Sequence, residues 1–410
     1  MADLLGINAI LIASLIVFAL AKRAPQISQL LFIALVLRLA MSLFNVYFGS
    51  LPDSKFDAVA FELQAWTWAQ DEFDEVFFRY PSGVEHGWIV SWIISVLYNL
   101  TDRSILMAQT VSLIFGMGSI YLGWKLCVEL WSEKVAIKSA WLIALFPSLS
   151  LYSVLLMREV YIYFFILLAL LGVIRWVKFN KLKDLLIVIV GFVIAALFHG
   201  SMILGLLVFI GFAFYRSFNG LVTLSKNYFF YHLIIFTFSF IFLILFFLSK
   251  YSIPYIGSFE DIGPVLFKQR FEWTAVGGTA FPQWLLPSGL FETIWKTPIR
   301  ILYFIISPMP WDISSPRHIL GFIDGIFYII LLSYLWKGRK LLLRRKSTKI
   351  LLTIFVVYLI TFSLGTANSG TALRHKTKLF PILVVLAAPF IPVVNLRNSR
   401  VISRKKYESL

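Results

Sequence analysis

The feature that most constrains this chain is a repeated pattern of long apolar runs separated by short polar turns. The first runs are Leu4–Leu20, which ends at Lys22-Arg23, and Ser28–Phe48. Both are near the ~20 residues that a helix needs to cross a bilayer. Only helices and closed barrels satisfy their backbone in lipid, and the alternation of a membrane barrel is absent. The sequence therefore predicts an all-α polytopic integral membrane protein.

Composition and charge agree with this fold class. Hydrophobic residues make up 60% of the chain and charged residues 14%, whereas a soluble domain would have about a quarter charged residues. The formal net charge of +16 falls in short clusters between apolar runs, as in cytoplasmic loops. We expect membrane lipids as partners and no nucleic acid. A single cysteine, Cys127, excludes an internal disulfide framework.

The basic cluster Lys337–Lys349 fixes the predicted topology. The positive-inside rule places it in the cytoplasm, provided that the short apolar stretch His86–Leu100 is a juxtamembrane or re-entrant helix. The N-terminus is then outside, and about eleven spans follow. The predicted spans are Leu4–Leu20, Ser28–Phe48, Ser104–Val128, Val135–Leu156, Val160–Val177, Leu185–Phe198, Met202–Tyr215, Tyr228–Leu248, His318–Trp336, Ile350–Leu364 and Thr377–Val394.

This topology treats residues 1–410 as a single transmembrane domain. It has a first external loop at 49–103, a second external segment at 249–317 that is rich in proline, and a cytoplasmic basic tail at 395–410. Within the first loop, Phe56–Gln70 has the spacing of an amphipathic helix on the membrane surface.

The first external loop is acidic although the chain as a whole is basic. Asp53 follows Pro52 just beyond the second span, where its carboxylate could act as a general base or orient an acceptor hydroxyl. The alternative is that Asp53 or Ser54 caps the following helix. Asp57 lies one helical turn further along. The acidic run Asp71–Glu75 is interpreted as a solvated rim.

The topology also brings unusual cations to the outer face. Arg374-His375-Lys376-Thr377-Lys378 breaks the positive-inside rule, and an external phosphate would compensate for its charge. Gly365, Asn368 and Gly370 predict a flexible approach that could close over a headgroup. The alternative is an anchor for lipid phosphates.

Several other charged or histidine residues are also predicted to lie on the outer face. Arg158-Glu159, at the lip of a predicted hairpin, is either part of the site or an interfacial ion pair in a turn. His199 is expected to be packed or hydrogen-bonded. Arg270 and Arg300 add to the positive field. No metal-ligand spacing of known specificity is present, so a divalent metal stays open and no cofactor is assigned.

The stretch Tyr80–Glu159 resembles a known family of membrane proteins. A YPSG turn, a short apolar helix ending in YNLTDRS, and the run FPSLSLYSVLLMRE resemble the N-terminal half of GT-C membrane glycosyltransferases, the group of protein O-mannosyltransferases and aminoarabinose transferases. The resemblance implies a polyprenyl-phosphate sugar donor, transfer on the outer face and a catalytic Asp in the first loop. Asp53 matches that position best, Asp57 is second, and Glu159 corresponds to an acidic residue that often follows the Tyr-Ser segment. The later stretch GTANSGTALRHKTKLFP looks more like surface-polysaccharide polymerases.

These observations lead to one leading hypothesis and two alternatives. The first is a glycosyltransferase of the bacterial inner membrane that moves a sugar from a polyprenyl-phosphate-linked donor to an envelope glycan or lipid. The alternatives are an O-antigen or capsular repeat-unit polymerase and a transporter or flippase of lipid-linked glycans. The candidate catalytic residues are Asp53, Asp57 and Glu159, and the candidate phosphate-binding residues are Arg374, His375, Lys378, Arg158 and Arg270.

Overall fold

The computed structural model describes residues 1–80, 86–222, 229–248, 280–313 and 315–392. In this part the regular elements are helices, and the extended backbone contact is a single bridge between Ala280 and Asn368. The predicted all-α class is confirmed. The N-terminal elements are α1 (Ala2–Arg23), η1 (Pro25–Ile27), α2 (Ser28–Leu43), η2 (Phe44–Phe48), α3 (Asp57–Trp68), α4 (Phe73–Phe78), η3 (His86–Trp88), α5 (Ile89–Leu100), α6 (Ile105–Leu130), α7 (Glu133–Leu145) and α8 (Pro147–Tyr152).

The remaining helices follow the same pattern of long helices joined by short turns. They are α9 (Arg158–Phe179), α10 (Leu182–Phe198), η4 (Gly200–Met202), α11 (Ile203–Val222), α12 (Phe229–Leu248), η6 (Gln283–Leu285), α14 (Leu290–Ile306), η7 (Pro310–Asp312), α15 (Pro316–Lys337), α16 (Arg339–Arg344), α17 (Lys346–Gly365), α18 (Ser369–Ala387) and η8 (Ala388–Phe390).

The described residues contain seven segments that are long and apolar enough to cross a membrane. A polytopic membrane protein is therefore confirmed, and several of the predicted eleven spans correspond to shorter or more polar helices. The seven segments are Ala2–Arg23, Pro25–Phe48, Ile105–Leu130, Arg158–Phe179, Gly200–Val222, His318–Lys337 and Lys346–Gly365.

The predicted span Val135–Leu156 is broken in the middle. Helix α7 ends at Leu145, Phe146 is extended, and Pro147 starts the short helix α8. Proline has no N–H to donate and disfavours helical geometry in the residue before it, which explains the break. Buried Arg38 of α2 stabilises it, because its guanidinium donates to Ala144 O at 3.0 Å and to Ser153 Oγ at 2.8 Å.

The last predicted span begins earlier than expected. Asn368 caps α18 by accepting a hydrogen bond from Thr371 N at 2.8 Å. The helix therefore includes Gly370 and the whole basic motif Arg374–Lys378, which the sequence placed on a flexible external loop. The prediction of a loop was wrong, because a satisfied N-cap outweighs the low helix propensity of one glycine.

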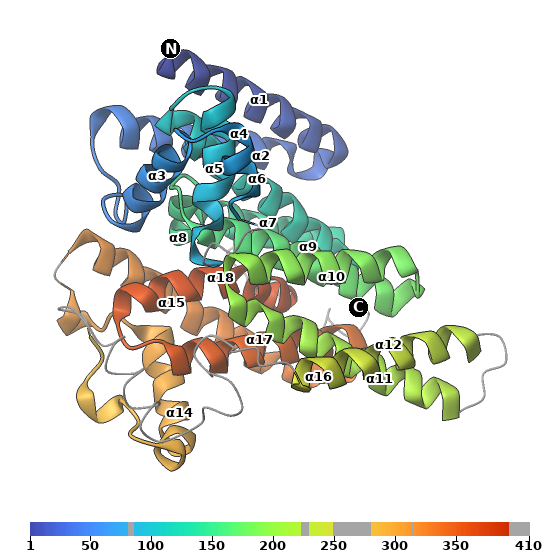
Figure 1. Cartoon of the computed structure of the whole chain (residues 1–410). Coiled ribbons are helices and arrows are strands. Elements are labelled where there is room, and N and C mark those ends of the chain that lie inside the picture. The colour runs from blue at the N-terminus through green and yellow to red at the C-terminus, as the bar shows by residue number, and fades with distance from the viewer. Residues whose placement is uncertain (81–85, 223–228, 249–279, 314, 393–410) are drawn as a thin grey trace, which may run out of the picture.

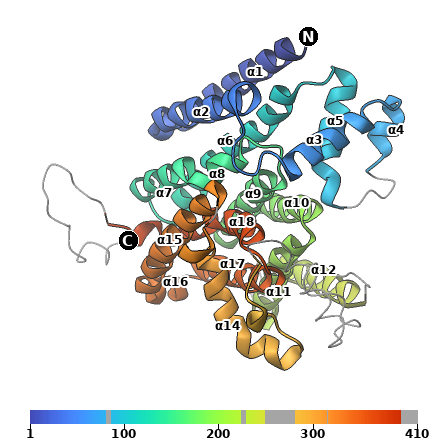
Figure 2. The ribbon, with the colours of Figure 1, turned by 90° about the vertical axis from the view of Figure 1, so that its left-hand side faces the viewer.

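Figures 1 and 2 show which helices lie at the centre of the molecule. Helices α1 and α2 run side by side, and α3, α4 and α5 form a group at one end. Helices α8, α9 and α18 meet between that group and the C-terminal helices α14, α15 and α17. The helices of the first loop and the C-terminal helices therefore lie on either side of α8, α9 and α18.

The helices of the first loop are tied together by polar contacts. Helix α3 occupies most of the predicted stretch Phe56–Gln70 and packs on α5. Ser91 donates to Phe61 O at 2.8 Å, and Tyr98 donates to Glu62 Oε1 at 3.0 Å. Burial raises the pKa of the Tyr98 hydroxyl, and the neighbouring Glu62 carboxylate reinforces the shift, so Tyr98 stays a donor.

Candidate active site

Asp53 lies in the turn between α2 and α3 and is held by a partner from α8. Its backbone φ is 63°, a left-handed conformation that Asp tolerates better than most residues. The side chain is buried, and Tyr152 donates its hydroxyl to Asp53 Oδ2 at 2.7 Å. The N-cap of α3 is Phe56, with no side-chain capping bond there among the described contacts. The capping alternative for Asp53 or Ser54 is therefore wrong.

Arg374 of α18 joins both predicted catalytic aspartates. Its Nε lies 3.5 Å from Asp53 Oδ2, and its Nη1 pairs with Asp57 Oδ2. Asp53 is inaccessible at its side chain, Arg374 is 18% exposed and Asp57 is 46% exposed, so the group runs from a buried carboxylate to an open one. The group therefore places a guanidinium beside two carboxylates, and a carboxylate is a side chain that can serve as a general base.

A second charged group lies deeper, one turn along α18. Residues four apart share a helix face, so Lys378 lies below Arg374. Its Nζ is 3.6 Å from Glu159 Oε1 and 3.1 Å from His375 Nδ1. Since an ammonium only donates, His375 accepts at Nδ1. The His375 ring stacks on Phe362 at 4.4 Å and packs edge-on against His199 at 5.5 Å.

The structure thus brings together most of the predicted site residues. They differ in exposure to solvent. Arg374 and Asp57 are partly exposed, whereas Glu159, His375 and Lys378 are buried. Arg158 lies at the start of α9 with its guanidinium over the Phe61 ring at 5.6 Å, and Glu159 pairs with Lys378 of α18. Arg270 falls outside the described residues.

Two other cations of the predicted outer face, Arg300 and Lys376, donate to backbone carbonyls. Arg300 is buried and donates to the carbonyls of Ser363, Leu364 and Thr366 at 3.1, 2.9 and 2.8 Å, which closes the C-terminal end of α17. The expectation that it adds to a phosphate field was wrong, because the last carbonyls of a buried helix need donors. Lys376 points away from Arg374 and donates to Ile305 O at 3.1 Å and Ser307 O at 2.6 Å.

Sequence reasoning missed two residues near this site. Tyr152 falls inside the predicted membrane span Val135–Leu156. Its position in the Tyr-Ser segment after Pro147 is the sequence feature that could have identified it as a site residue. Asp324 of α15 is buried, inside the predicted span His318–Trp336. An ionisable residue within an apolar run is itself a signal for function or pairing.

Two cavities flank the Asp53 turn. One, which we call the Asp53 cavity, has a volume of about 480 Å³ and is lined by Asp53, Phe56 and the start of α15 at Ser315, Pro316 and His318. The other, which we call the amide cavity, has a volume of about 310 Å³ and lies between α2, α3 and α6. Ser50 and Lys55 line both. Asp53 is therefore one of the residues that line a cavity, although its side chain is buried in this structure.

The remaining acidic residues of the first loop lie outside the group formed by Asp53, Asp57 and Arg374. Asp71 pairs with Arg79 within the first loop, and Glu72, Asp74 and Glu75 are exposed, as a solvated rim should be. Among the described residues, no group of three or more His, Cys, Asp and Glu side chains is arranged to hold a metal ion.

Comparison with known proteins supports the class that this architecture suggests. The family model for dolichyl-phosphate-mannose-protein mannosyltransferases matches residues 85–247, which is less than half of the chain. The match confirms the resemblance to GT-C membrane glycosyltransferases. It includes Arg158, Glu159 and His199, whereas Asp53, Asp57 and Arg374 lie outside it. No curated protein and no solved structure matches the chain significantly.

Proposed function

We propose that the protein is a membrane glycosyltransferase of the bacterial inner membrane. It transfers a sugar from a polyprenyl-phosphate-linked donor to an envelope glycan or lipid acceptor on the outer face. The observation that carries the proposal is the buried carboxylate of Asp53, a cavity-lining residue, which is held by Tyr152 and Arg374. The family match over residues 85–247 supports the donor class.

Asp53 acts as the general base in this proposal. The acceptor hydroxyl gives its proton to the Asp53 carboxylate while its oxygen bonds to the anomeric carbon of the donor sugar. The bond from that carbon to the phosphate oxygen breaks, and the polyprenyl phosphate leaves with the electron pair. A single displacement of this kind inverts the anomeric configuration. Tyr152 holds Asp53 Oδ2 in place, because its hydroxyl donates at 2.7 Å.

Arg374 stabilises the negative charge that grows on the leaving phosphate. Its Nε and Nη1 contact Asp53 and Asp57, and neither contact uses Nη2, which in this proposal donates to a phosphate oxygen. Such a donor is stronger toward the transition state than toward the ground state, because the phosphate gains charge as the bond breaks. Lys378 and His375 support Arg374 from the buried side, and Arg158 lies at the start of α9, over the Phe61 ring.

Reconstitution tests this proposal directly. The purified protein in phosphatidylcholine vesicles would be given a polyprenyl-phosphate sugar with a radiolabelled sugar and a panel of polyprenyl-diphosphate-linked glycans. We expect a labelled glycan of inverted anomeric configuration, and its absence with Asp53→Asn. A growing ladder of repeat units from a polyprenyl-diphosphate oligosaccharide would instead support the polymerase. Movement of lipid-linked glycan across the bilayer without any new glycosidic bond would overturn the proposal in favour of a flippase.

A further inference from the structure

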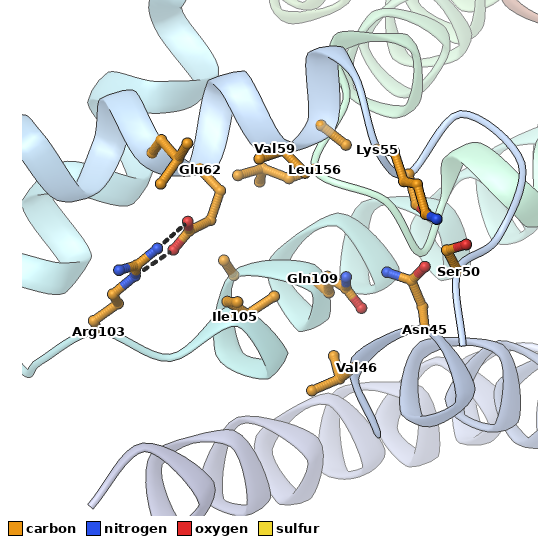
Figure 3. A pocket seen from close by; sticks show the side chains of 14 residues that line it. Asn45, Val46, Ser50, Lys55, Val59, Glu62, Arg103, Ile105, Gln109 and Leu156 are labelled. Atoms are coloured by element: carbon orange, nitrogen blue, oxygen red, sulfur yellow. Dashed lines mark hydrogen bonds and ion pairs between the residues drawn. The ribbon is translucent and has the colours of Figure 1, made fainter. Parts of the chain in front are cut away.

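The amide cavity contains two side-chain amides whose orientation is fixed by internal hydrogen bonds. Asn45 Oδ1 accepts from Leu51 N at 3.0 Å, and Gln109 Oε1 accepts from Ser42 Oγ at 2.8 Å. Because both oxygens are engaged, the NH₂ groups are the ends that face the cavity. Figure 3 shows these two nitrogens turned toward each other, and the Lys55 amine lies on the Ser50 side of the same cavity. The cavity therefore presents donors to a ligand.

The charges around the cavity sum to one positive charge. Glu62 is neutralised by Arg103, whose Nε and Nη2 lie 2.9 Å and 2.7 Å from its two carboxylate oxygens, and Tyr98 also donates to it. Lys55 is left as the cation of the site. Two amide donors and an ammonium around a space of about 310 Å³ suit an oxyanion better than a neutral group.

The rim of the cavity is apolar and exposed. Val59 is 42% exposed, Leu63 is 48% exposed and Ile105 is 44% exposed, and all three line the cavity. Ile105 begins the membrane-spanning helix α6. An anion alone would gain nothing from these side chains, whereas a lipid that carries the anion would bury them. The ligand that fits both the hydrogen-bond donors and the apolar side chains is an amphiphile with a phosphate head.

The location relative to Asp53 indicates which lipid this is. The amide cavity lies on the face of α3 formed by Ala58, Val59 and Glu62, whereas Asp57 turns to Arg374. Lys55 belongs to both cavities and is two residues from Asp53. A head group at Lys55 would thus lie next to the turn that carries the proposed base, whereas Arg374 lines neither cavity.

We propose that the amide cavity binds the phosphate of a second, polyprenyl-type lipid, so that the acceptor is lipid-linked like the donor. Asn45, Gln109 and Lys55 hold the phosphate, and Val59, Leu63 and Ile105 contact the first part of the lipid chain. The assignment as acceptor depends on the proposed function, whereas the phosphate-lipid site itself does not.

Alkylation of a cysteine placed in the cavity tests the site without any sugar transfer. The full-length Val46→Cys protein in phosphatidylcholine nanodiscs would be treated with a water-soluble maleimide, to which the buried Cys127 is inaccessible. We expect polyprenyl monophosphate to slow alkylation at least tenfold. Inorganic phosphate at the same concentration should give no protection, and equal protection by phosphatidylglycerol would overturn the choice of lipid.

Isosteric variants show whether the two amides make the site. Asn45→Asp and Gln109→Glu keep the oxygens that accept from Leu51 and Ser42 but replace the NH₂ donors with carboxylate oxygen. Both should abolish protection, whereas Gln64→Glu, on α3 but not among the cavity-lining residues, should retain it. An unchanged alkylation rate without lipid shows that the cavity is intact. Protection that survives both cavity variants would overturn the proposal.

Two further results separate this inference from the proposed function. Protection of Val46→Cys should persist in Arg374→Ala, and its loss there would assign the lipid to the donor side instead. Sugar transfer by the wild-type protein without protection would contradict the second lipid site alone. Protection without sugar transfer to any acceptor would leave a phosphate-lipid site and contradict the transferase, whereas protection with transfer only to acceptors that carry no lipid would contradict the acceptor assignment alone.

Discussion

Nε of Arg374 lies 3.5 Å from Oδ2 of Asp53, although 321 positions separate the two residues in the chain. The contact joins the first external turn to the last long helix. It also means that the proposed base and the proposed phosphate-binding residue share one ionic group with Asp57.

Asp53→Asn should lower kcat for sugar transfer by about 10²-fold or more, because loss of a general base typically costs 10²–10⁴-fold. Asn tolerates the left-handed backbone at this position, so the fold should be kept. The measurement is initial rate in reconstituted vesicles, with folding checked by size-exclusion chromatography. Asp74→Asn, an exposed acid in the same loop, is the matched control and should be fully active. A D53N protein of normal rate would move the base to Asp57.

Arg374→Ala should raise the KM for the lipid-linked donor at least tenfold and lower kcat as well. The guanidinium is proposed to contact the phosphate in both the ground state and the transition state. Arg374→Lys should be intermediate, since a lysine keeps the charge but cannot bridge Asp53 and Asp57 as a planar guanidinium does. Arg79→Lys, which alters a surface pair with Asp71, serves as control. Unchanged KM and kcat for Arg374→Ala would exclude phosphate binding there.

Tyr152→Phe should reduce kcat about tenfold or more while leaving the KM for donor nearly unchanged. A hydrogen bond to a charged group contributes ~1.5–3 kcal/mol, and its loss lets the Asp53 carboxylate rotate. Tyr163→Phe is the matched control, because Tyr163 is equally buried but donates to the backbone oxygen of Leu149 at 3.3 Å. Equal rates for both variants would show that Tyr152 only packs.

Glu159→Gln should destabilise the protein by about 3 kcal/mol, because removing one partner of a buried ion pair leaves the Lys378 charge uncompensated. Adding Lys378→Met should restore most of the loss, as measured by thermal unfolding in detergent. Activity of this double variant then decides the role of the Glu159–Lys378 pair. A stable but inactive double variant supports a part for the pair in the reaction, and an active one limits the pair to structure.

The outer-face location is tested by labelling in intact cells. A cysteine at Asp74, exposed in the first loop, should react with a membrane-impermeant maleimide from outside. A cysteine at Lys340, exposed on α16 in the basic cluster, should react only after permeabilisation. The reverse pattern would place the Asp53 site in the cytoplasm and contradict the topology.

The sequence by itself determined the fold class and drew attention to most of the candidate residues. Apolar runs near the thickness of a bilayer leave few folds open, because backbone polar groups in lipid must pair within the segment. Asp53 and Arg374 stood out because ionisable groups next to a membrane are costly and need a reason. Such arguments depend on local composition, so they could be made without coordinates.

Only the tertiary structure decided which charged side chains meet. Arg374, Lys376 and Lys378 lie within five positions, yet the helical rotation of α18 sends Arg374 to Asp53 and Lys376 to the carbonyls at the end of α14. The partners of these residues come from helices far away in the chain, and helix packing sets which face meets which. Tyr152 became visible for the same reason, because a break at Pro147 turns α8 toward the Asp53 turn.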